Sequence, residues 1–242
     1  MEKIKQAIQA FLSSKDYPKF DLKAVLFDMD GVLFDSMPNH ALSWHKVMKA
    51  HRLDLSYDEA YRHEGRKGFD TIQFVCRQQG VQISADEIKA IYAEKTALFQ
   101  KLPSPERMDG SYELLQKVWN DSLTPMLVTG SGQASLLDSL NVFFPGIFRQ
   151  ENMITSFDVK NGKPNPEPYL KALEKGDLKR WEAIVIENAP LGIEAACRAG
   201  LFVIAVNTGP LSDICLWEAG VNLLYPSMPA LNEAWEQLKE NF

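Results

Sequence analysis

The chain has 242 residues, of which 45% are hydrophobic and 24% are charged, proportions that exclude a disordered or collagen-like chain. Its 26 basic and 32 acidic residues give a net charge of −6, the wrong sign for a protein that neutralises nucleic-acid phosphates over a broad surface. No apolar run approaches the roughly 20 residues of a membrane helix, so we expect neither a nucleic-acid nor a membrane partner.

The N-terminal segment combines a helical pattern with scattered charges. Its apolar residues follow the spacing of one helix face: Ile4, Ile8, Phe11 and Leu12. This spacing predicts a helix within residues 1–20 that packs on the main body. Lysines interrupt the apolar stretch that a secretory signal needs, and the three cysteines of the chain form no C-x-x-C pair. We therefore expect a cytoplasmic protein with reduced thiols.

Four short apolar runs further along the chain predict buried strands: residues 23–27, 125–129, 183–186 and 202–206. Helical patterns lie between and beside these runs: residues 111–120, 134–142, 166–175 and 191–199. Strands that alternate with helices predict an α/β fold with a Rossmann-like, doubly wound parallel sheet.

Residues 37–102 interrupt this alternation, because they are helical in pattern and contain no convincing strand. We interpret them as an inserted helical cap that leaves the core after the first strand and returns near Pro103 and Pro105. The core then consists of residues 1–36 and 103–242, with residues 1–20 as an added N-terminal helix.

Polar residues follow several of the predicted strands, where function gathers in an open α/β sheet. Asp28 and Asp30 follow the first strand, and residues two apart in an extended segment point to the same side. Further polar residues lie after the later runs: Thr129, Gly130, Ser131, Lys163, Glu187 and Asn188. We therefore expect one polar site at the carboxyl edge of the sheet.

The chemistry of this set suits phosphoryl transfer. Two neighbouring carboxylates repel unless a cation neutralises them, and oxygen ligands favour Mg²⁺. Asp28 would then attack a phosphoryl group, while Asp30 protonates the leaving oxygen and later deprotonates water. Thr129, the backbone N–H groups of Gly130 and Ser131, and Lys163 would hold the phosphoryl oxygens.

Four segments resemble the motifs of the haloacid dehalogenase superfamily: FDMDGVLFDS, LVTGS, the lysine of GKPNPEPY, and VIENAPLGIEAACRAG. The first motif and the cap that follows it are similar to the β-phosphoglucomutase-like branch. The resemblance implies a Rossmann-like core, a mobile four-helix cap and Mg²⁺-dependent phosphoryl transfer through Asp28, with Asp30 and Glu187 among the metal ligands.

The fourth motif departs from the family pattern, which usually ends in two carboxylates. Here Glu187 is followed by Asn188, whose neutral oxygen is a poorer magnesium ligand. We expect Glu64 of the cap to supply the missing carboxylate, although a solvated carboxylate at this position is an open alternative. If Glu64 binds the metal, binding would favour a closed cap. The pair of Asn188 and Glu64 resembles inorganic pyrophosphatase-type members of the branch.

A second departure from the family pattern lies in the cap loop. Sugar-phosphate mutases of the family carry an arginine there that holds the distal phosphate. This chain has Gly68 there, with Arg66 as a possible substrate-binding substitute. His40 matches a position that steadies the general acid in relatives, or is a half-buried helix residue. Lys95 faces either the cleft or solvent, and most such lysines are solvated. The other histidines are expected at the surface.

These observations favour a monomeric, Mg²⁺-dependent phosphohydrolase with an aspartyl-phosphate intermediate. Its expected substrate is a small phosphorylated anion, inorganic pyrophosphate or a simple phosphate ester. A β-phosphoglucomutase-type enzyme is the alternative. A third hypothesis is a catalytically silent protein that binds a phosphorylated ligand. The intact Asp28 and Asp30 argue against it.

Overall fold

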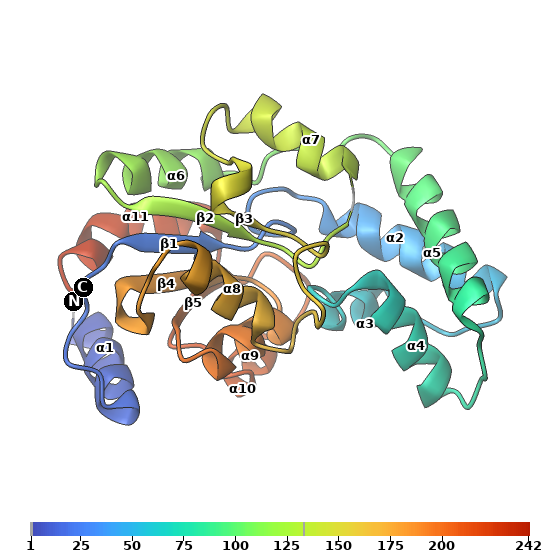
Figure 1. Ribbon diagram of the computed structural model, residues 1–242, viewed down its shortest axis with the longest axis horizontal. Coiled ribbons are helices and arrows are strands. Elements are labelled where there is room, and N and C mark those ends of the chain that lie inside the picture. The colour runs from blue at the N-terminus through green and yellow to red at the C-terminus, as the bar shows by residue number, and fades with distance from the viewer. Residues whose placement is uncertain (1, 133) are drawn as a thin grey trace.

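A sheet of six parallel strands lies at the centre of the computed structural model, which describes residues 2–132 and 134–242 (Figure 1). Its strand order is β3-β2-β1-β4-β5-β6. The bounds are β1 Ala24–Phe27, β2 Thr124–Val128, β3 Met153–Ile154, β4 Ala183–Glu187, β5 Phe202–Val206 and β6 Leu223–Tyr225. The predicted α/β class and its four strands are confirmed. The two strands missing from the prediction, β3 and β6, have only two and three residues, too few to form a recognisable apolar run.

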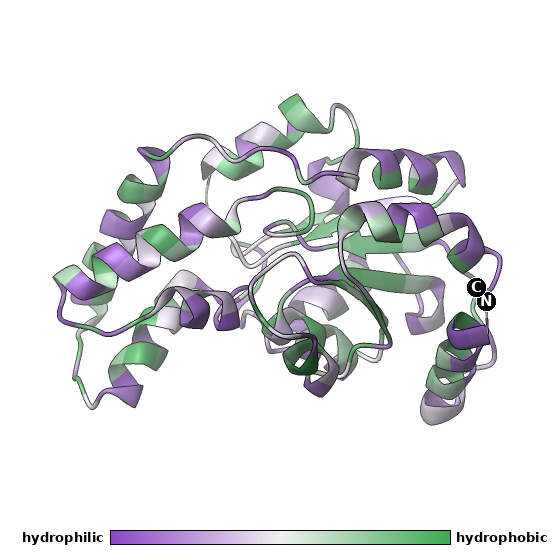
Figure 2. Ribbon diagram, turned by 180° about the vertical axis from the view of Figure 1, so that it is seen from behind, coloured by the Kyte–Doolittle hydropathy of each residue, from purple (hydrophilic) through white to green (hydrophobic). Residues whose placement is uncertain are grey.

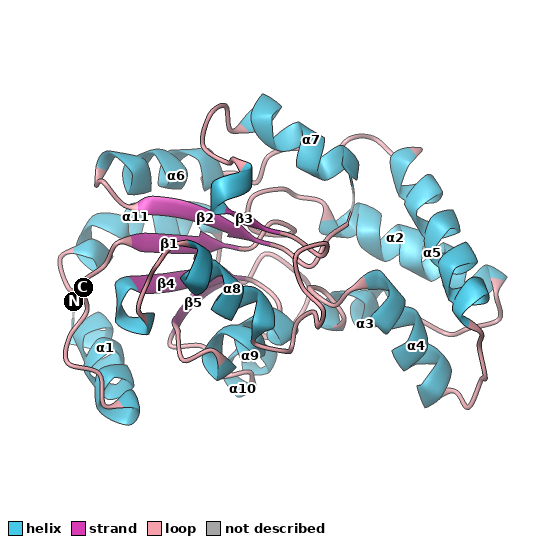
Figure 3. Ribbon diagram, viewed as in Figure 1, coloured by secondary structure: helices cyan, strands magenta, loops and turns pink. Residues whose placement is uncertain are grey.

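Helices cover the sheet and extend beyond one end of it (Figure 3). Their bounds are α1 Glu2–Lys15, α2 Met37–Ala50, α3 Tyr57–Arg62, α4 Gly68–Gln78, α5 Ala85–Gln100, α6 Ser111–Asn120, α7 Ala134–Phe143, α8 Glu167–Lys175, α9 Pro190–Arg198, α10 Asp213–Glu218 and α11 Met228–Lys239, with 3₁₀ turns at Gln150–Asn152 and Arg180–Glu182. Within the described ranges, no helix is both long and apolar enough to cross a bilayer.

The sheet is buried on both faces because its residues alternate between two apolar layers. Val25 and Phe27 pack into a layer with α1, α6, α7 and α11, whereas Ala24 and Leu26 pack against α8, α9 and α10. Figure 2 shows hydrophobic residues along the strands and mixed character on the helices around them. The three-layer arrangement leaves the ends of the strands as the place where polar side chains can gather.

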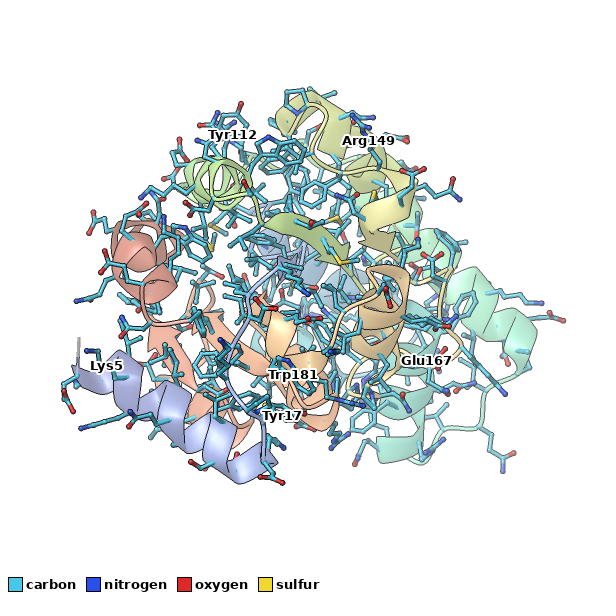
Figure 4. All side chains as sticks on the ribbon, turned by 60° about the vertical axis from the view of Figure 1, so that its left-hand side comes forward. Lys5, Tyr17, Tyr112, Arg149, Glu167 and Trp181 are labelled. Carbon is cyan, nitrogen blue, oxygen red and sulfur yellow. The ribbon has the colours of Figure 1, made fainter. Side chains whose placement is uncertain are left out.

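The N-terminal helix α1 packs on one face of this core, as its helical spacing predicts. Ile4 and Ile8 are buried, and the ring of Phe11 lies 5.3 Å from that of Phe202. Tyr17 follows the helix, and its ring lies beside that of Trp181 with 5.4 Å between centroids (Figure 4). This end of the chain is therefore an added layer of packing, on the opposite side of the molecule from the carboxyl ends of the strands.

Helices α2 to α5 form a separate group beyond the carboxyl ends of the strands (Figure 1). They have an apolar cluster of their own, which includes Met48, Ile72 and Ile91. This separate cluster supports residues 37–102 as the cap, and we propose that these residues form the unit that covers the polar edge of the sheet.

Candidate active site

The polar residues meet where the strand order of the sheet reverses. Strands β1 and β4 are neighbours, and their chains continue to opposite sides, which leaves a crevice at their carboxyl ends. Asp28 follows β1, and its backbone N–H donates to the carbonyl of Ile186 in β4 at 3.0 Å. The structure brings most of the predicted residues together here in buried positions: Asp28, Asp30, Thr129, Lys163, Glu187, Asn188, His40 and Glu64.

The ammonium group of Lys163 connects these residues. It donates to Asp28 Oδ1 at 2.5 Å, to Glu187 Oε1 at 2.7 Å and to the Val128 carbonyl at 3.0 Å. An ammonium group has three donors, so protein oxygens use all of them. Burial opposes the charge, but the carboxylates of Asp28 and Glu187 outweigh it and raise the pKa of Lys163 well above its ordinary value. Lys163 is therefore a fixed positive charge beside Asp28.

Glu187 is held from four directions. Its Oε1 accepts from Lys163 and from the hydroxyl of Tyr169 at 2.9 Å. Its Oε2 accepts from the backbone N–H groups of Asn188 at 2.9 Å and Ala189 at 3.1 Å. A carboxylate offers about four acceptor positions, so those of Glu187 are filled. The Glu187 carboxylate therefore holds the Lys163 ammonium in a fixed position.

Asp28 lies in a place that disfavours its charge. Burial raises its pKa to about 8, although the adjacent Lys163 ammonium favours the ionised form. The carboxylates of Glu187 and Asp30 add to the rise. Near neutral pH, a further positive charge at this position would favour the ionised carboxylate that a nucleophile requires.

Asp30 belongs to a chain of polar groups that runs into the cap. Its Oδ1 accepts from the Ser36 hydroxyl at 2.5 Å and lies 3.1 Å from His40 Nε2. Lys95 Nζ lies 2.6 Å from His40 Nδ1. Burial opposes ionisation of Asp30, but His40 and Ser36 outweigh it and lower its pKa. Of the two readings of His40, the structure favours the partner of Asp30.

Of the two alternatives for Lys95, the structure supports the position in the cleft. The residue is 2% exposed, and its Nζ lies 5.2 Å from the ring centre of Trp44 and 5.1 Å from that of Phe99. Burial lowers its pKa to about 7. The helical spacing indicates this burial, because Lys95 lies on the same face of α5 as the buried residues Ile88, Ile91 and Phe99.

We expect the Lys95→Met variant to raise the free energy of unfolding at pH 6 by about 3 kcal/mol, since it removes a buried charge. The folded pKa is about 7 and the ordinary value is 10.5, so the folded protein releases this proton first as pH rises. The cost of burial is complete below pH 7 and is relieved between pH 7 and 10.5, and the advantage of the variant should shrink over that range. Urea unfolding at pH 6, 8 and 10 measures it.

The control is Lys89→Met, which changes an exposed lysine of the same helix and should alter stability by less than about 0.5 kcal/mol. A Lys95→Met variant that is less stable than the wild type at every pH would contradict the assignment of Lys95 as a costly buried cation.

Glu64 reaches the core from the loop between α3 and α4. Its Oε1 accepts from Asn188 Nδ2 at 2.8 Å, and Gly31 makes room for this amide, because a Cβ there would lie 2.0 Å from Nδ2. Gly31 also has a φ of +76°, which suits glycine. Burial, and then the carboxylate of Asp28, raise the pKa of Glu64 well above its ordinary value.

A cation would satisfy the oxygen that this arrangement leaves unpaired. Asn188 Oδ1 is buried without a hydrogen-bond partner, which is rare for a polar atom. Among the described residues, no three His, Cys, Asp or Glu side chains are arranged to hold a metal ion by themselves. Asp28, Asp30 and Glu64 therefore do not form a metal site by themselves. Their carboxylates and the Asn188 oxygen are nevertheless oxygen ligands of the kind that Mg²⁺ prefers.

The loop from the cap lies directly on the core. A Cβ on Gly130 would lie 2.1 Å from the carbonyl oxygen of Gly65, and Lys67 Nζ donates to the Val159 carbonyl at 3.0 Å. The pocket between cap and core is partly open to solvent and has a volume of about 50 Å³. Its walls come from both parts of the chain and include Asp28, Asp30, Gly130, Ser131, His40, His63, Glu64, Arg66, Tyr92 and Lys95. The cap loop is therefore in contact with the core beside the carboxylates.

The remaining predicted residues lie around this cavity. Thr129 Oγ1 accepts from the backbone N–H of Ser131 at 3.0 Å. Arg66 has its guanidinium carbon 4.7 Å from the ring centre of Phe74, and its buried Nε has no hydrogen-bond partner. His63 is half-buried in the wall, so the expectation of a surface position is wrong for it. Sequence reasoning also missed Ser36 and Tyr169, whose hydroxyls have no periodic pattern to reveal them.

Comparisons with known proteins show the family to which the chain belongs. A family model described as haloacid dehalogenase-like hydrolase matches residues 25–206. Validoxylamine A 7'-phosphate phosphatase of Streptomyces hygroscopicus subsp. limoneus is 32% identical and is aligned over 77% of this chain and 86% of its own length. A phosphorylated carbohydrates phosphatase of Thermotoga maritima is 29% identical over 90% of this chain and 100% of its own length.

Among solved structures, a Bacteroides vulgatus protein described as a candidate β-phosphoglucomutase is 58% identical, with a TM-score of 0.96 over 99% of this chain and 98% of that one. The family model spans β1 to β5 and thus every strand end that contributes to the site. The chain therefore belongs to the haloacid dehalogenase-like hydrolase family, in its β-phosphoglucomutase-like branch.

Proposed function

We propose that this protein is a Mg²⁺-dependent phosphohydrolase that acts on a small phosphorylated metabolite through an aspartyl-phosphate on Asp28. The observation that carries the proposal is the buried contact between the Lys163 ammonium and the Asp28 carboxylate at the switch point of the sheet. A fixed positive charge beside a carboxylate that lines the pocket suits attack on an anionic phosphoryl group.

The reaction has two steps. An oxygen of Asp28 attacks phosphorus, the bond to the leaving oxygen breaks, and Asp30 in its acid form protonates that oxygen. Water then attacks the phosphorus of the acyl phosphate, Asp30 accepts the proton of water, and the bond between phosphorus and Asp28 breaks. Ser36 and His40 hold Asp30 in place and favour its ionised form, which suits the second step.

The magnesium ligands that we propose are Asp28, Asp30, Asn188 and Glu64. When bound there, the ion supplies positive charge to the paired carboxylates and to the phosphoryl oxygens. The sequence also suggests Glu187 as a ligand. Because its acceptor positions are already filled, we propose that it holds Lys163 instead.

The other predicted residues surround the phosphoryl group in this scheme. Lys163, the Thr129 hydroxyl and the backbone N–H groups of Gly130 and Ser131 bind its oxygens from the core side. Arg66 binds the substrate from the cap wall, where its unpaired buried Nε supports an anion-binding role. Water is excluded while the cap is closed.

We propose pyrophosphate or a simple phosphate ester as the substrate. The pocket between cap and core is small, with a volume of about 50 Å³, and it is lined by Asp28 and Asp30, which suits a phosphoryl group at its core end. The lowered pKa of Asp30 favours its ionised form, which makes it a weak proton donor. This suits pyrophosphate, because its leaving group is phosphate, which needs little protonation. Two phosphatases among the relatives, named for validoxylamine A 7'-phosphate and for phosphorylated carbohydrates, support sugar phosphates as the ester class.

A β-phosphoglucomutase-type activity is the second candidate, because the 58% identical Bacteroides vulgatus protein is described in those terms. The cap loop weighs against it. A Cβ at Gly68 would lie 2.0 Å from a ring carbon of Tyr92, so the closed cap has no room for an arginine there to hold a distal phosphate. Arg66 would have to serve in its place.

Phosphate release from pyrophosphate, hexose 6-phosphates, β-glucose 1-phosphate and nucleotides, with and without Mg²⁺, tests the proposal. We expect release that depends on Mg²⁺ and is fastest with pyrophosphate. Sugar phosphates as the best substrates would retain the hydrolase and change its substrate. Isomerisation of β-glucose 1-phosphate with little free phosphate would favour the mutase, and the absence of any turnover would favour a silent binding protein.

A further inference from the structure

Tyr169 has a buried hydroxyl that packing alone does not require. The residue lies in α8 with no exposed surface, and its ring belongs to the apolar layer that contains Ala172 and Leu173. A phenylalanine would fill the same space. A hydroxyl in an apolar layer is unfavourable unless it is hydrogen-bonded, and this one donates to Glu187 Oε1 at 2.9 Å.

The carboxylate that receives this bond has no freedom to turn. Two backbone N–H groups, those of Asn188 and Ala189, hold Glu187 Oε2. Oε1 has two acceptor directions, and the Tyr169 hydroxyl occupies one of them. The ammonium of Lys163 can therefore approach Oε1 from one direction only, at 2.7 Å.

The same ammonium must serve the phosphoryl group. All three N–H groups of Lys163 already donate to protein oxygens. A phosphoryl oxygen can therefore accept a hydrogen bond from Lys163 only if one of these bonds breaks. The Lys163 N–H that donates to Asp28 lies beside the oxygen that would attack phosphorus. If Oε1 had a second acceptor direction open, the Lys163 ammonium could move around Glu187 and away from Asp28.

We propose that the Tyr169 hydroxyl is a positioning group for phosphoryl transfer, because it fixes through Glu187 the place where the Lys163 ammonium meets Asp28 and the transferred phosphoryl group. The inference rests on the proposed hydrolase activity and adds a residue outside the cavity to it. Tyr169 touches neither substrate nor metal, so its effect must appear in the chemical step and not in binding.

The test is Tyr169→Phe, which removes one oxygen and keeps the ring. We expect kcat for the best substrate to fall about tenfold, while KM and the Mg²⁺ concentration for half-maximal rate change less than about twofold. Inhibition by orthovanadate, which resembles the transferred phosphoryl group, should weaken about tenfold, while inhibition by inorganic phosphate stays the same. General destabilisation of the protein would weaken inhibition by vanadate and by phosphate to the same extent.

The matched control is Tyr17→Phe, which removes another hydroxyl bond, to the Gly200 carbonyl at 3.2 Å, far from the site. It should leave kcat, KM, the Mg²⁺ dependence and inhibition by both anions unchanged. The double variant Tyr169→Phe with Glu187→Ala should be no slower than Glu187→Ala alone, because the hydroxyl acts through the Glu187 oxygen that the alanine removes.

Three results would overturn the inference: an unchanged kcat in Tyr169→Phe, equal weakening of vanadate and phosphate inhibition, or full additivity with Glu187→Ala. If the double variant does not fold, the comparison of the two anions in Tyr169→Phe decides alone. No turnover by the wild type would instead overturn the proposed function, and the inference with it.

Discussion

Replacing Asp28 by asparagine should lower phosphate release by at least about 1,000-fold, because the amide cannot form the acyl phosphate. The side chain keeps its size, so the fold should persist. Removal of the carboxylate also removes a buried group whose pKa is raised to about 8, and the thermal midpoint should therefore change little or rise. Steady-state phosphate release and thermal unfolding of the same preparation measure both effects.

A covalent test identifies the nucleophile directly. Acid quenching of the wild type during turnover, followed by borohydride, would reduce an aspartyl-phosphate to homoserine, which mass spectrometry would locate at position 28. The Asp28→Asn variant should not give this product. The control is Asp21→Asn, which changes an exposed carboxylate paired with Lys23 and should keep full activity. Full activity of Asp28→Asn, or homoserine at another residue, would contradict the mechanism.

Glu64→Gln should raise the Mg²⁺ concentration needed for half-maximal turnover by about tenfold or more, because it removes a charged oxygen from the metal set. The same variant should be at least as stable as the wild type without Mg²⁺. Burial beside Asp28 raises the pKa of Glu64, and the charge is therefore a cost in the metal-free protein. The rise in thermal midpoint on addition of Mg²⁺ should be smaller than in the wild type.

Asp58→Asn is the control for this prediction, since Asp58 is an exposed carboxylate of the neighbouring helix α3. It should leave both the Mg²⁺ dependence and the thermal response unchanged. Lys95 is unsuitable as a surface control because it contacts His40 within the site. If Glu64→Gln and Asp58→Asn responded equally to Mg²⁺, Glu64 would not be a metal ligand, and the Asn188 oxygen would need another explanation.

The local pattern of the sequence was sufficient for the fold class. Runs such as 183–186 and 202–206 are apolar throughout because a parallel sheet is buried on both faces, and the structure has β4 and β5 there. The same rule located the polar site, since Asp28 and Thr129 follow such runs and parallel strands end at one edge. These features depend on residues near one another in the chain.

The tertiary structure alone decided which atoms meet. Glu187 and Lys163 are 24 residues apart, and no spacing rule predicts that the carboxylate uses all its acceptor positions on Lys163, Tyr169 and two backbone N–H groups. The sequence left the position of Lys95 open because a lysine is normally solvated, whereas here its ammonium is buried against Trp44 and Phe99 and lies beside His40. Hydrogen-bond partners depend on distances of a few tenths of an ångström between segments far apart in sequence, and only the packed structure determines such distances.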